Sequence, residues 1–308
     1  MNPVHSVART SSNFALPDFA RNISTMPNCI SCGRELPSPN EPHNICPDCR
    51  AAIMARAQSS APLPARRAPA VPLQAMPVTV AVVGLNVLVF LAMVFTGSSI
   101  VEPNIQDLIK WGADTGYHTV LFQPWRMLTS NYVHIGILHI GFNMWCLWNL
   151  GALAERIFDR WAYFLTYTIC GIAGSMVSVG LHPVRIGAGA SGAIFGLAGA
   201  LISALYLGHL PVHPSALKST MKSLLSFAGY NLFFGAVVPA IDNSAHIGGL
   251  VAGLALGAIL APRLTAPPDQ RRVWEMWVFI GSAVILFAAY YFLHGVTLRY
   301  AAAHHLLQ

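Results

Sequence analysis

Long apolar stretches separated by short polar connections follow one another from residue 78 to residue 293. A helix needs about 20 mostly apolar residues to cross a bilayer. The pattern therefore predicts seven membrane helices, over residues 78–95, 135–154, 161–180, 191–207, 224–241, 245–260 and 273–293. The fourth and the sixth start at polar residues, which a membrane tolerates where a water-filled cavity meets the helix end. We expect these two helix starts to face one common wet pocket.

The remainder of the chain lacks this pattern and divides into shorter segments. Residues 1–28 have no apolar signal-peptide core and are predicted to be disordered. Their basic, serine-bearing composition also suits a transit peptide, but the cysteine motif directly after them favours a cytosolic tail. Residues 29–49 hold four cysteines, residues 50–76 form an Ala/Pro-rich linker, and residues 294–308 form a C-terminal tail. Residues 77–293 remain as the membrane domain.

The composition agrees with this division. Hydrophobic residues make up 55% of the 308 residues and charged residues only 10%. Soluble domains carry about a quarter charged residues, so the composition indicates an all-α polytopic membrane protein. The net charge of +6 suggests nucleic-acid binding at first, but cytoplasmic loops of membrane proteins also collect Lys and Arg. A cytoplasmic N-terminus places eleven basic residues inside and four outside. We expect this orientation in a bacterial inner (plasma) membrane, a lipid bilayer as surroundings, and no nucleic-acid partner.

Two cysteine pairs of equal spacing, Cys29-x-x-Cys32 and Cys46-x-x-Cys49, flank a turn-rich spacer. Such pairs are typical of a four-thiolate zinc site, and Gly33 suits the tight turn after the first pair. About twenty residues cannot bury a core alone, so the metal would supply the folding energy. Disulfides are the alternative, and a reducing cytosol disfavours them. We predict a small knuckle or ribbon around a structural Zn²⁺ held by the four cysteines, with protein docking as one role. His43 could replace one cysteine, but four are already in register.

Two polar residues sit where close helix packing is predicted. Ser191 opens the fourth helix within Gly-Ala-Ser-Gly, and His246 lies near the start of the sixth within Ala-His-Ile-Gly-Gly. Glycines continue along one face of each helix: Gly192, Gly196 and Gly199 in the fourth, and Gly249, Gly253 and Gly257 in the sixth. Small residues let membrane helices approach closely. We therefore expect the Ser191 hydroxyl to reach hydrogen-bonding distance of the His246 imidazole, which would take its proton.

Other polar residues accompany this pair. His139 and Asn143 lie four apart in the second predicted helix and so share a face. Such residues serve either interhelical hydrogen bonding or, as donors, the stabilisation of a developing oxyanion. Asp242, in the turn before the sixth helix, is interpreted as a rim residue, which leaves a dyad and not a triad. The hydrolase motif Gly-x-Ser-x-Gly is only half matched, because Ala193 takes its last position.

A family resemblance rests on these residues taken together. The motifs, in order, are Trp125-Arg126, His134, His139, Asn143, Gly-Ala-Ser191-Gly and Ala-His246-x-x-Gly. This set resembles the rhomboid family of intramembrane serine proteases over roughly residues 77–293. The resemblance implies a six-helix bundle with a seventh, C-terminal transmembrane helix, and Glu155 matches a structural acidic position.

The resemblance also implies roles. Ser191 would attack a peptide bond in a transmembrane segment of a membrane-protein substrate, with His246 as the general base. Asn143, His139 and the Ser191 N–H would form the oxyanion hole, beside Gly189 of the same motif. Catalysis would need no cofactor.

One position departs from the family pattern. Many members carry a tyrosine that packs on the catalytic histidine, and Phe195 here keeps the ring without the hydroxyl. Two other functions stay open, an inactive relative that binds membrane proteins and a channel or transporter with pore histidines. A channel leaves the serine among glycines without a role, and inactive relatives usually lack the serine or the histidine. A metalloprotease is disfavoured because His139 does not open an H-E-x-x-H motif.

Overall fold

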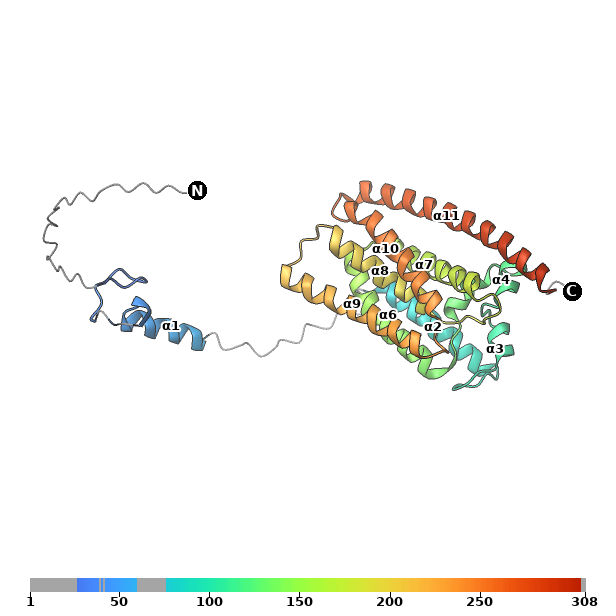
Figure 1. Ribbon diagram of the computed structural model, residues 1–308, viewed down its shortest axis with the longest axis horizontal. Coiled ribbons are helices and arrows are strands. Elements are labelled where there is room, and N and C mark those ends of the chain that lie inside the picture. The colour runs from blue at the N-terminus through green and yellow to red at the C-terminus, as the bar shows by residue number, and fades with distance from the viewer. Residues whose placement is uncertain (1–26, 39, 41, 60–75, 306–308) are drawn as a thin grey trace, which may run out of the picture. The chain divides into compact units, whose positions relative to one another are not determined.

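The computed structural model describes residues 27–38, 40, 42–59 and 76–305 (Figure 1). The chain divides into two compact units, Met1–Pro69 and Ala70–Gln308, and each is described by itself. The predicted disorder of residues 1–28 falls almost entirely outside the described residues. The same holds for residues 60–75 of the predicted linker.

The small unit is built around its cysteines. Asn28 and Glu35 pair in antiparallel fashion, a short 3-10 turn η1 covers Pro42–Asn44, and helix α1 covers Pro47–Ser59. Leu36 is buried against the sulfur-bearing residues and forms the centre of a very small core. The linker prediction is wrong for residues 50–59, because the alanines there extend α1; alanine is the strongest helix former.

The membrane unit contains a helix at each of the seven predicted positions. They are α2 (Pro77–Phe95), α6 (Gly136–Ile157), α7 (Arg160–Leu181), α8 (Ser191–Leu207), α9 (Pro214–Val237), α10 (Asn243–Leu260) and α11 (Pro268–Ala303). Among the described residues, α2, α6, α7, α10 and α11 are long and apolar enough to cross a membrane. Helix α8 is shorter, and α9 begins earlier than predicted, at Pro214, with Lys218 and Lys222 in its first half. The protein is an integral multi-pass membrane protein.

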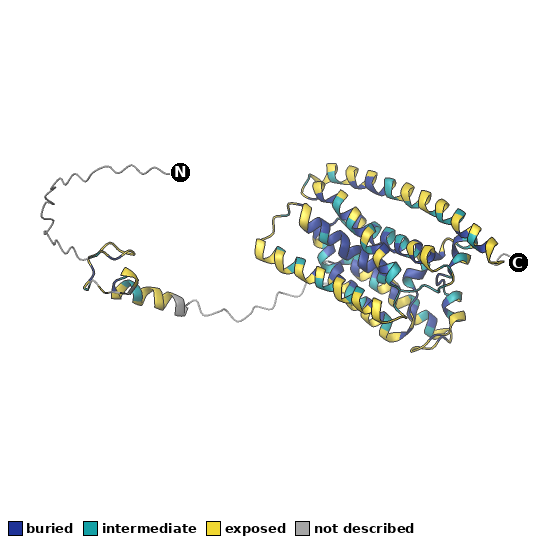
Figure 2. Cartoon of the chain, viewed as in Figure 1, coloured by how far each residue is buried: buried dark blue, intermediate teal, exposed yellow. Residues whose placement is uncertain are grey.

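Helix α8 forms the core of this unit, and its buried residues make up much of the dark central region of Figure 2. Helix α10 packs against it backbone to backbone. A Cβ atom on Gly253 would overlap the carbonyl oxygen of Gly196, and one on Gly249 would overlap that of Gly192. The predicted close packing through glycines is therefore confirmed, and it brings the first turns of α8 and α10 together.

The connection between α2 and α6 carries four short helices. They are α3 (Ile105–Lys110), α4 (Tyr117–Phe122), α5 (Arg126–Thr129) and the 3-10 turn η3 (Ser130–Tyr132). The Arg126 guanidinium organises this segment by donating to the carbonyl oxygens of Ile109 (2.6 Å) and Ala113 (2.9 Å). It also lies 4.6 Å from the centre of the Trp125 ring. The Trp125-Arg126 motif thus fixes α5 against the end of α3 and the residues that follow it.

Two further contacts tie the helices together. The Glu155 carboxylate at the end of α6 accepts hydrogen bonds from the backbone N–H and the hydroxyl of Thr79 in α2, at 2.5 and 2.9 Å. Arg271 at the start of α11 pairs with Glu275 at 2.8 Å and donates to the carbonyl oxygen of Ile157 at 3.2 Å. Helix α11 continues to Ala303, so the predicted tail from residue 294 is wrong over most of its length.

Candidate active site

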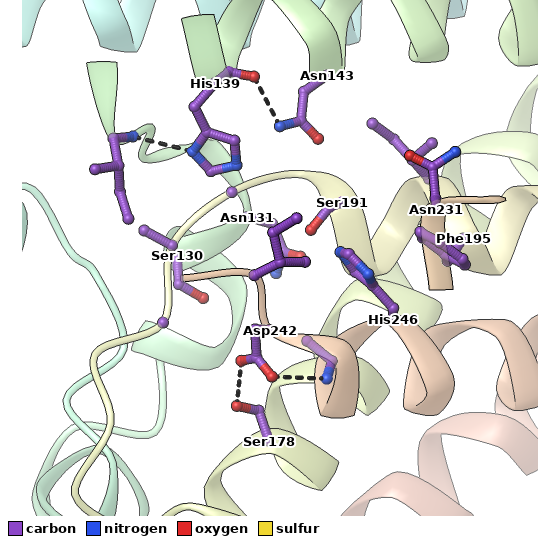
Figure 3. Close-up of a pocket in the computed structure, with 18 of the residues that line it drawn as sticks. Ser130, Asn131, His139, Asn143, Ser178, Ser191, Phe195, Asn231, Asp242 and His246 are labelled. Atoms are coloured by element: carbon purple, nitrogen blue, oxygen red, sulfur yellow. Dashed lines mark hydrogen bonds between the residues drawn. The ribbon is translucent and has the colours of Figure 1, made fainter. Parts of the chain in front are cut away.

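A cavity of about 760 Å³ opens at the first turns of α8 and α10. The predicted site residues Ser191, His246, His139, Asn143 and Gly189 all line it, as Figure 3 shows for the first four. The common pocket expected from the polar helix starts is therefore present. Its walls mix apolar side chains of α6 and α9 with polar groups from the connecting loops.

The loop before α8 places Ser191 at the N-terminus of that helix. Gly189 has a φ of +122°, a conformation that favours glycine, and its N–H donates to the Ser130 carbonyl oxygen at 2.9 Å. The Ala190 N–H donates to Nε2 of the fully buried His134 at 3.4 Å. Because Ser191 starts α8, the N–H groups of this first turn have no intrahelical acceptor and carry the positive end of the helix dipole. An anion at this point would be stabilised.

His246 projects from the first turns of α10 toward the same space as the Ser191 hydroxyl (Figure 3). Its ring stacks on Phe195 of α8, with centroids 4.3 Å apart and planes 13° from parallel. Its Nδ1 is buried and has no hydrogen-bond partner among the described residues. No hydrogen bond joins it to Ser191 in the residues drawn, and catalytic hydrogen bonds often form only once substrate is bound.

Asp242 caps the helix of the histidine and does not touch its ring. The carboxylate accepts from the Ala245 N–H at 3.1 Å and from the Ser178 hydroxyl at 2.5 Å. Both its oxygens are thus engaged at the N-terminus of α10. This arrangement is the one expected of a dyad, which has no acidic residue to orient the imidazole. The stacked Phe195 ring orients the imidazole instead.

The two donors expected from α6 lie on the opposite wall. His139 Nδ1 accepts from the Ile135 N–H at 3.2 Å, so the neutral ring carries its proton on Nε2. That edge of the ring lies close to Gly189, where a Cβ atom would be 2.9 Å from Nε2. The Asn143 amide donates one N–H to the His139 carbonyl oxygen at 2.9 Å, and its second N–H remains available. Both side chains can donate into the cavity.

Several lining residues were missed from the sequence. Asn231 of α9 faces the cavity in Figure 3, and its amide in an apolar run was the same signal that marked Asn143. Asp114, between α3 and α4, is buried in the wall and accepts from the Gly116 N–H at 2.9 Å. Burial, with the nearby Asp242 charge, raises the pKa of Asp114 to about 7. No sequence signal separates Asp114 from an ordinary loop aspartate.

The four cysteines of the small unit form a separate cluster. Their sulfur atoms all lie within 4.8 Å of one another, and none of the four is in a disulfide. The Cys46 N–H donates to the Cys29 sulfur at 3.3 Å, and this bond lowers the pKa of the Cys29 thiol to about 6. Gly33 has a φ of +74°, as the expected tight turn requires. The cluster could hold a metal ion, and His43 is not part of it.

Comparison with known proteins adds independent findings. The family model described as the Rhomboid domain matches residues 121–263. The chain is 37% identical to rhomboid protease GluP of Bacillus subtilis over 178 residues, which cover 58% of this chain and 34% of that protein. It is 37% identical to RHOMBOID-like protein 4 of Arabidopsis thaliana over 141 residues, covering 46% of this chain and 35% of the relative.

A third relative also matches. Rhomboid-like protease 3 of Toxoplasma gondii is 30% identical over 158 residues, which cover 50% of this chain and 59% of that protein. The chain thus spans between 34% and 59% of the lengths of these three relatives. The matched region contains every residue of the cavity wall named above except Asp114.

Proposed function

We propose that this chain, whose residues 121–263 match the Rhomboid domain family model, is a serine endopeptidase that cuts transmembrane segments of membrane proteins. The observation that carries the proposal is the meeting of Ser191 and His246 in one cavity. They come from separate helices, and glycines without side chains bring those helices together. A hydroxyl and an imidazole at buried helix ends have little structural use unless they react with something in the cavity.

In the proposed reaction the imidazole of His246 takes the proton of the Ser191 hydroxyl while the oxygen attacks the scissile carbonyl carbon. The carbonyl oxygen becomes an oxyanion, held by the Ser191 N–H, the Asn143 amide and Nε2–H of His139. When the C–N bond breaks, His246 returns its proton to the leaving amine. A water molecule then attacks the acyl-enzyme, with His246 again taking and returning a proton. The cavity has room for that second nucleophile.

The substrate class follows from where the cavity lies. Its mouth is at the ends of membrane helices, and one wall is the outward-facing, aromatic-rich helix α9. We propose single-span or multi-span membrane proteins as partners, met within the bilayer. The bias of basic residues supports a cytoplasmic N-terminus, and we propose a bacterial inner membrane as the setting.

For the small unit we propose a structural Zn²⁺ held by Cys29, Cys32, Cys46 and Cys49. Zinc–thiolate bonds of about 2.3 Å in a tetrahedron place sulfur atoms just under 4 Å apart. The Cys32 and Cys46 sulfurs are 3.8 Å apart, close to that spacing. When bound, the ion would supply the folding energy that the small core around Leu36 lacks. Exposed Ile30 and Met54 beside it support a docking role for this unit.

The deciding experiment compares three variants of the purified protein on a test substrate with one membrane span. Ser191→Ala and His246→Ala should each reduce cleavage by at least about 10³-fold, because the dyad acts as a unit. Ser203→Ala, which removes a buried hydroxyl farther along the same helix, should cleave normally. A fluorophosphonate probe should label the wild type and not Ser191→Ala. Undiminished cleavage by Ser191→Ala would remove the proposed function.

A further inference from the structure

Asp114 is a buried carboxyl group that the proposed mechanism does not use. It lies between α3 and α4, only 3% of its surface is exposed, and it lines the same cavity as Ser191 and His246. Buried carboxyls are rare unless they are paired or have a task. No ion pair to it occurs among the described residues, so its surroundings need a closer account.

Asp114 joins the first extramembrane segment to the loop that carries the nucleophile. Its backbone N–H donates to the Gly187 carbonyl oxygen at 2.8 Å, and the Gly187 N–H donates back at 3.0 Å. This two-way bridge is an isolated pair outside any sheet. Gly187 is four residues before Ser191, and Gly189 and Ala190 between them are held by Ser130 and His134. The position of the loop therefore depends on where Asp114 lies.

The carboxyl group fixes the turn that follows it. It accepts from the N–H of Gly116, which has a φ of +65° and begins α4. The next residue, Tyr117, donates its N–H to the Pro183 carbonyl oxygen at 2.6 Å, at the other end of the same α7–α8 loop. The loop is thus held at Pro183 and at Gly187, with the Asp114 side chain between the two attachments.

The charges that face Asp114 differ in sign. The Gly116 N–H, the Thr119 hydroxyl and the Arg126 guanidinium favour its ionisation, while Asp242, the cap of the His246 helix, opposes it. Arg126 is held by the Ala113 and Ile109 carbonyl oxygens. Arg185 lines the same cavity, and its guanidinium donates to the carbonyl oxygens of Pro239 and Ala240 at 3.1 and 3.2 Å. The like charge that opposes ionisation of Asp114 thus belongs to the N-cap residue of α10, the helix that carries the proposed base.

We propose that Asp114 is a positioning residue for the Ser191–His246 dyad, whose neutral form holds the nucleophile loop in place and whose ionised form repels the Asp242 carboxylate and spreads the dyad. The inference rests on the proposed function. Because burial raises the pKa of Asp114 to about 7, the two forms exchange near neutral pH. Proteolysis then falls as pH rises through that range. The α3–α4 connection and the α7–α8 loop, joined through Asp114 and Gly187, together hold Ser191 in a pH-dependent position.

The test uses Asp114→Asn, which keeps the shape and an acceptor oxygen but cannot ionise. Cleavage rates of this variant and the wild type are measured from about pH 5 to about pH 8.5, and their ratio removes the titration of His246 that both share. The ratio should be near one at low pH and rise several-fold through a midpoint near 7. Glu102→Gln, an exposed acid in the same segment, should give a flat ratio. A flat ratio for Asp114→Asn would overturn the proposal.

A second measurement is independent of cleavage. In a Ser191→Ala background, the folded state keeps the Asp114 proton to about pH 7, whereas the unfolded chain releases it near its ordinary value of 3.8. Folding stability therefore falls as pH rises between these values. Asp114→Asn should gain in melting temperature relative to its parent over that window, on the order of several degrees. If Ser191→Ala cleaves, the proposed function fails; if the melting difference does not move with pH, the Asp114 proposal fails.

Discussion

Helices α8 and α11 are both apolar, yet the structure uses them in opposite ways. Helix α8 has 17 residues, of which 13 are buried, whereas the apolar part of the 36-residue α11 is only 11% buried. At about 1.5 Å per residue α11 is roughly 54 Å long, well beyond the ~30 Å of a hydrocarbon core. Hydropathy alone rates both as membrane helices. The difference lies in small residues, which fill α8 and let its neighbours touch its backbone.

The largest effect is expected from replacing a glycine at the contact between α8 and α10. Gly253→Leu should abolish cleavage and prevent normal folding, because its Cβ atom already meets the Gly196 backbone, which cannot move aside. Overpacking of a well-packed core costs about 1–3 kcal/mol and occasionally more, and contact with backbone that cannot move places this change at the upper end. Gly281→Leu in α11 is the matched control, since nothing lies within 4 Å of a Cβ atom there. Thermal unfolding in detergent and cleavage of the test substrate measure both. Normal cleavage by Gly253→Leu would contradict the backbone-to-backbone account.

An aromatic ring gives an intermediate effect. Phe195→Leu keeps an apolar side chain but removes the ring stacked on His246, so cleavage should fall about tenfold, the equivalent of a 0.5–1.5 kcal/mol ring contact. Phe195→Tyr keeps the stack and should stay within a few-fold of the wild type. Phe287→Leu removes an exposed ring of α11 that contacts only Tyr291 among the rings described, and it should change nothing. Equal rates for Phe195→Leu and Phe287→Leu would mean that the stack does not position the base.

The smallest effect on cleavage is expected from the cysteine cluster. Full-length wild type should contain about one zinc per chain, and Cys46→Ser should contain much less. Because the two units are separate, cleavage of the test substrate should stay within about twofold in Cys46→Ser. The control Cys146→Ser changes a cysteine of the membrane unit, and this variant should retain the zinc. Metal analysis of the purified proteins decides, and equal zinc in Cys46→Ser and wild type would remove the four-thiolate assignment.

Much of the membrane unit could be predicted because a bilayer imposes simple rules. Apolar length marked all seven helices, and the spacing of Gly249 and Gly253 indicated a flat face before any contact was known. The ends were less predictable. Hydropathy falls at His294, but α11 continues through residues 294–300 to Ala303, because the backbone hydrogen bonds of a helix do not require apolar side chains. For the same reason, the sequence did not reveal that the predicted linker begins inside helix α1, whose side chains form no apolar run.

The site was predictable to the extent that its chemistry resides in unusual residues. A serine, a histidine and an asparagine in apolar runs stand out, and all three line the cavity. Asp114 does not stand out, because aspartate is common in loops. Its burial depends on the pairing with Gly187, 73 residues later, which no local pattern encodes. The free Nδ1 of His246 likewise depends on Asp242 turning toward Ser178, a choice made only in three dimensions.

The contact of Gly249 and Gly253 with backbone carbonyl oxygens of α8 has one more consequence. Where two main chains touch, their separation follows from bond lengths and van der Waals radii, and no rotamer change elsewhere can adjust it. Helix α11 is only 11% buried over its apolar part, so we expect it to respond when the bilayer thickens or thins. The fixed contact between α8 and α10 separates the proposed Ser191–His246 pair from that response. Such a protein should work equally well in membranes of different thickness, with the lipid deciding only which partners arrive.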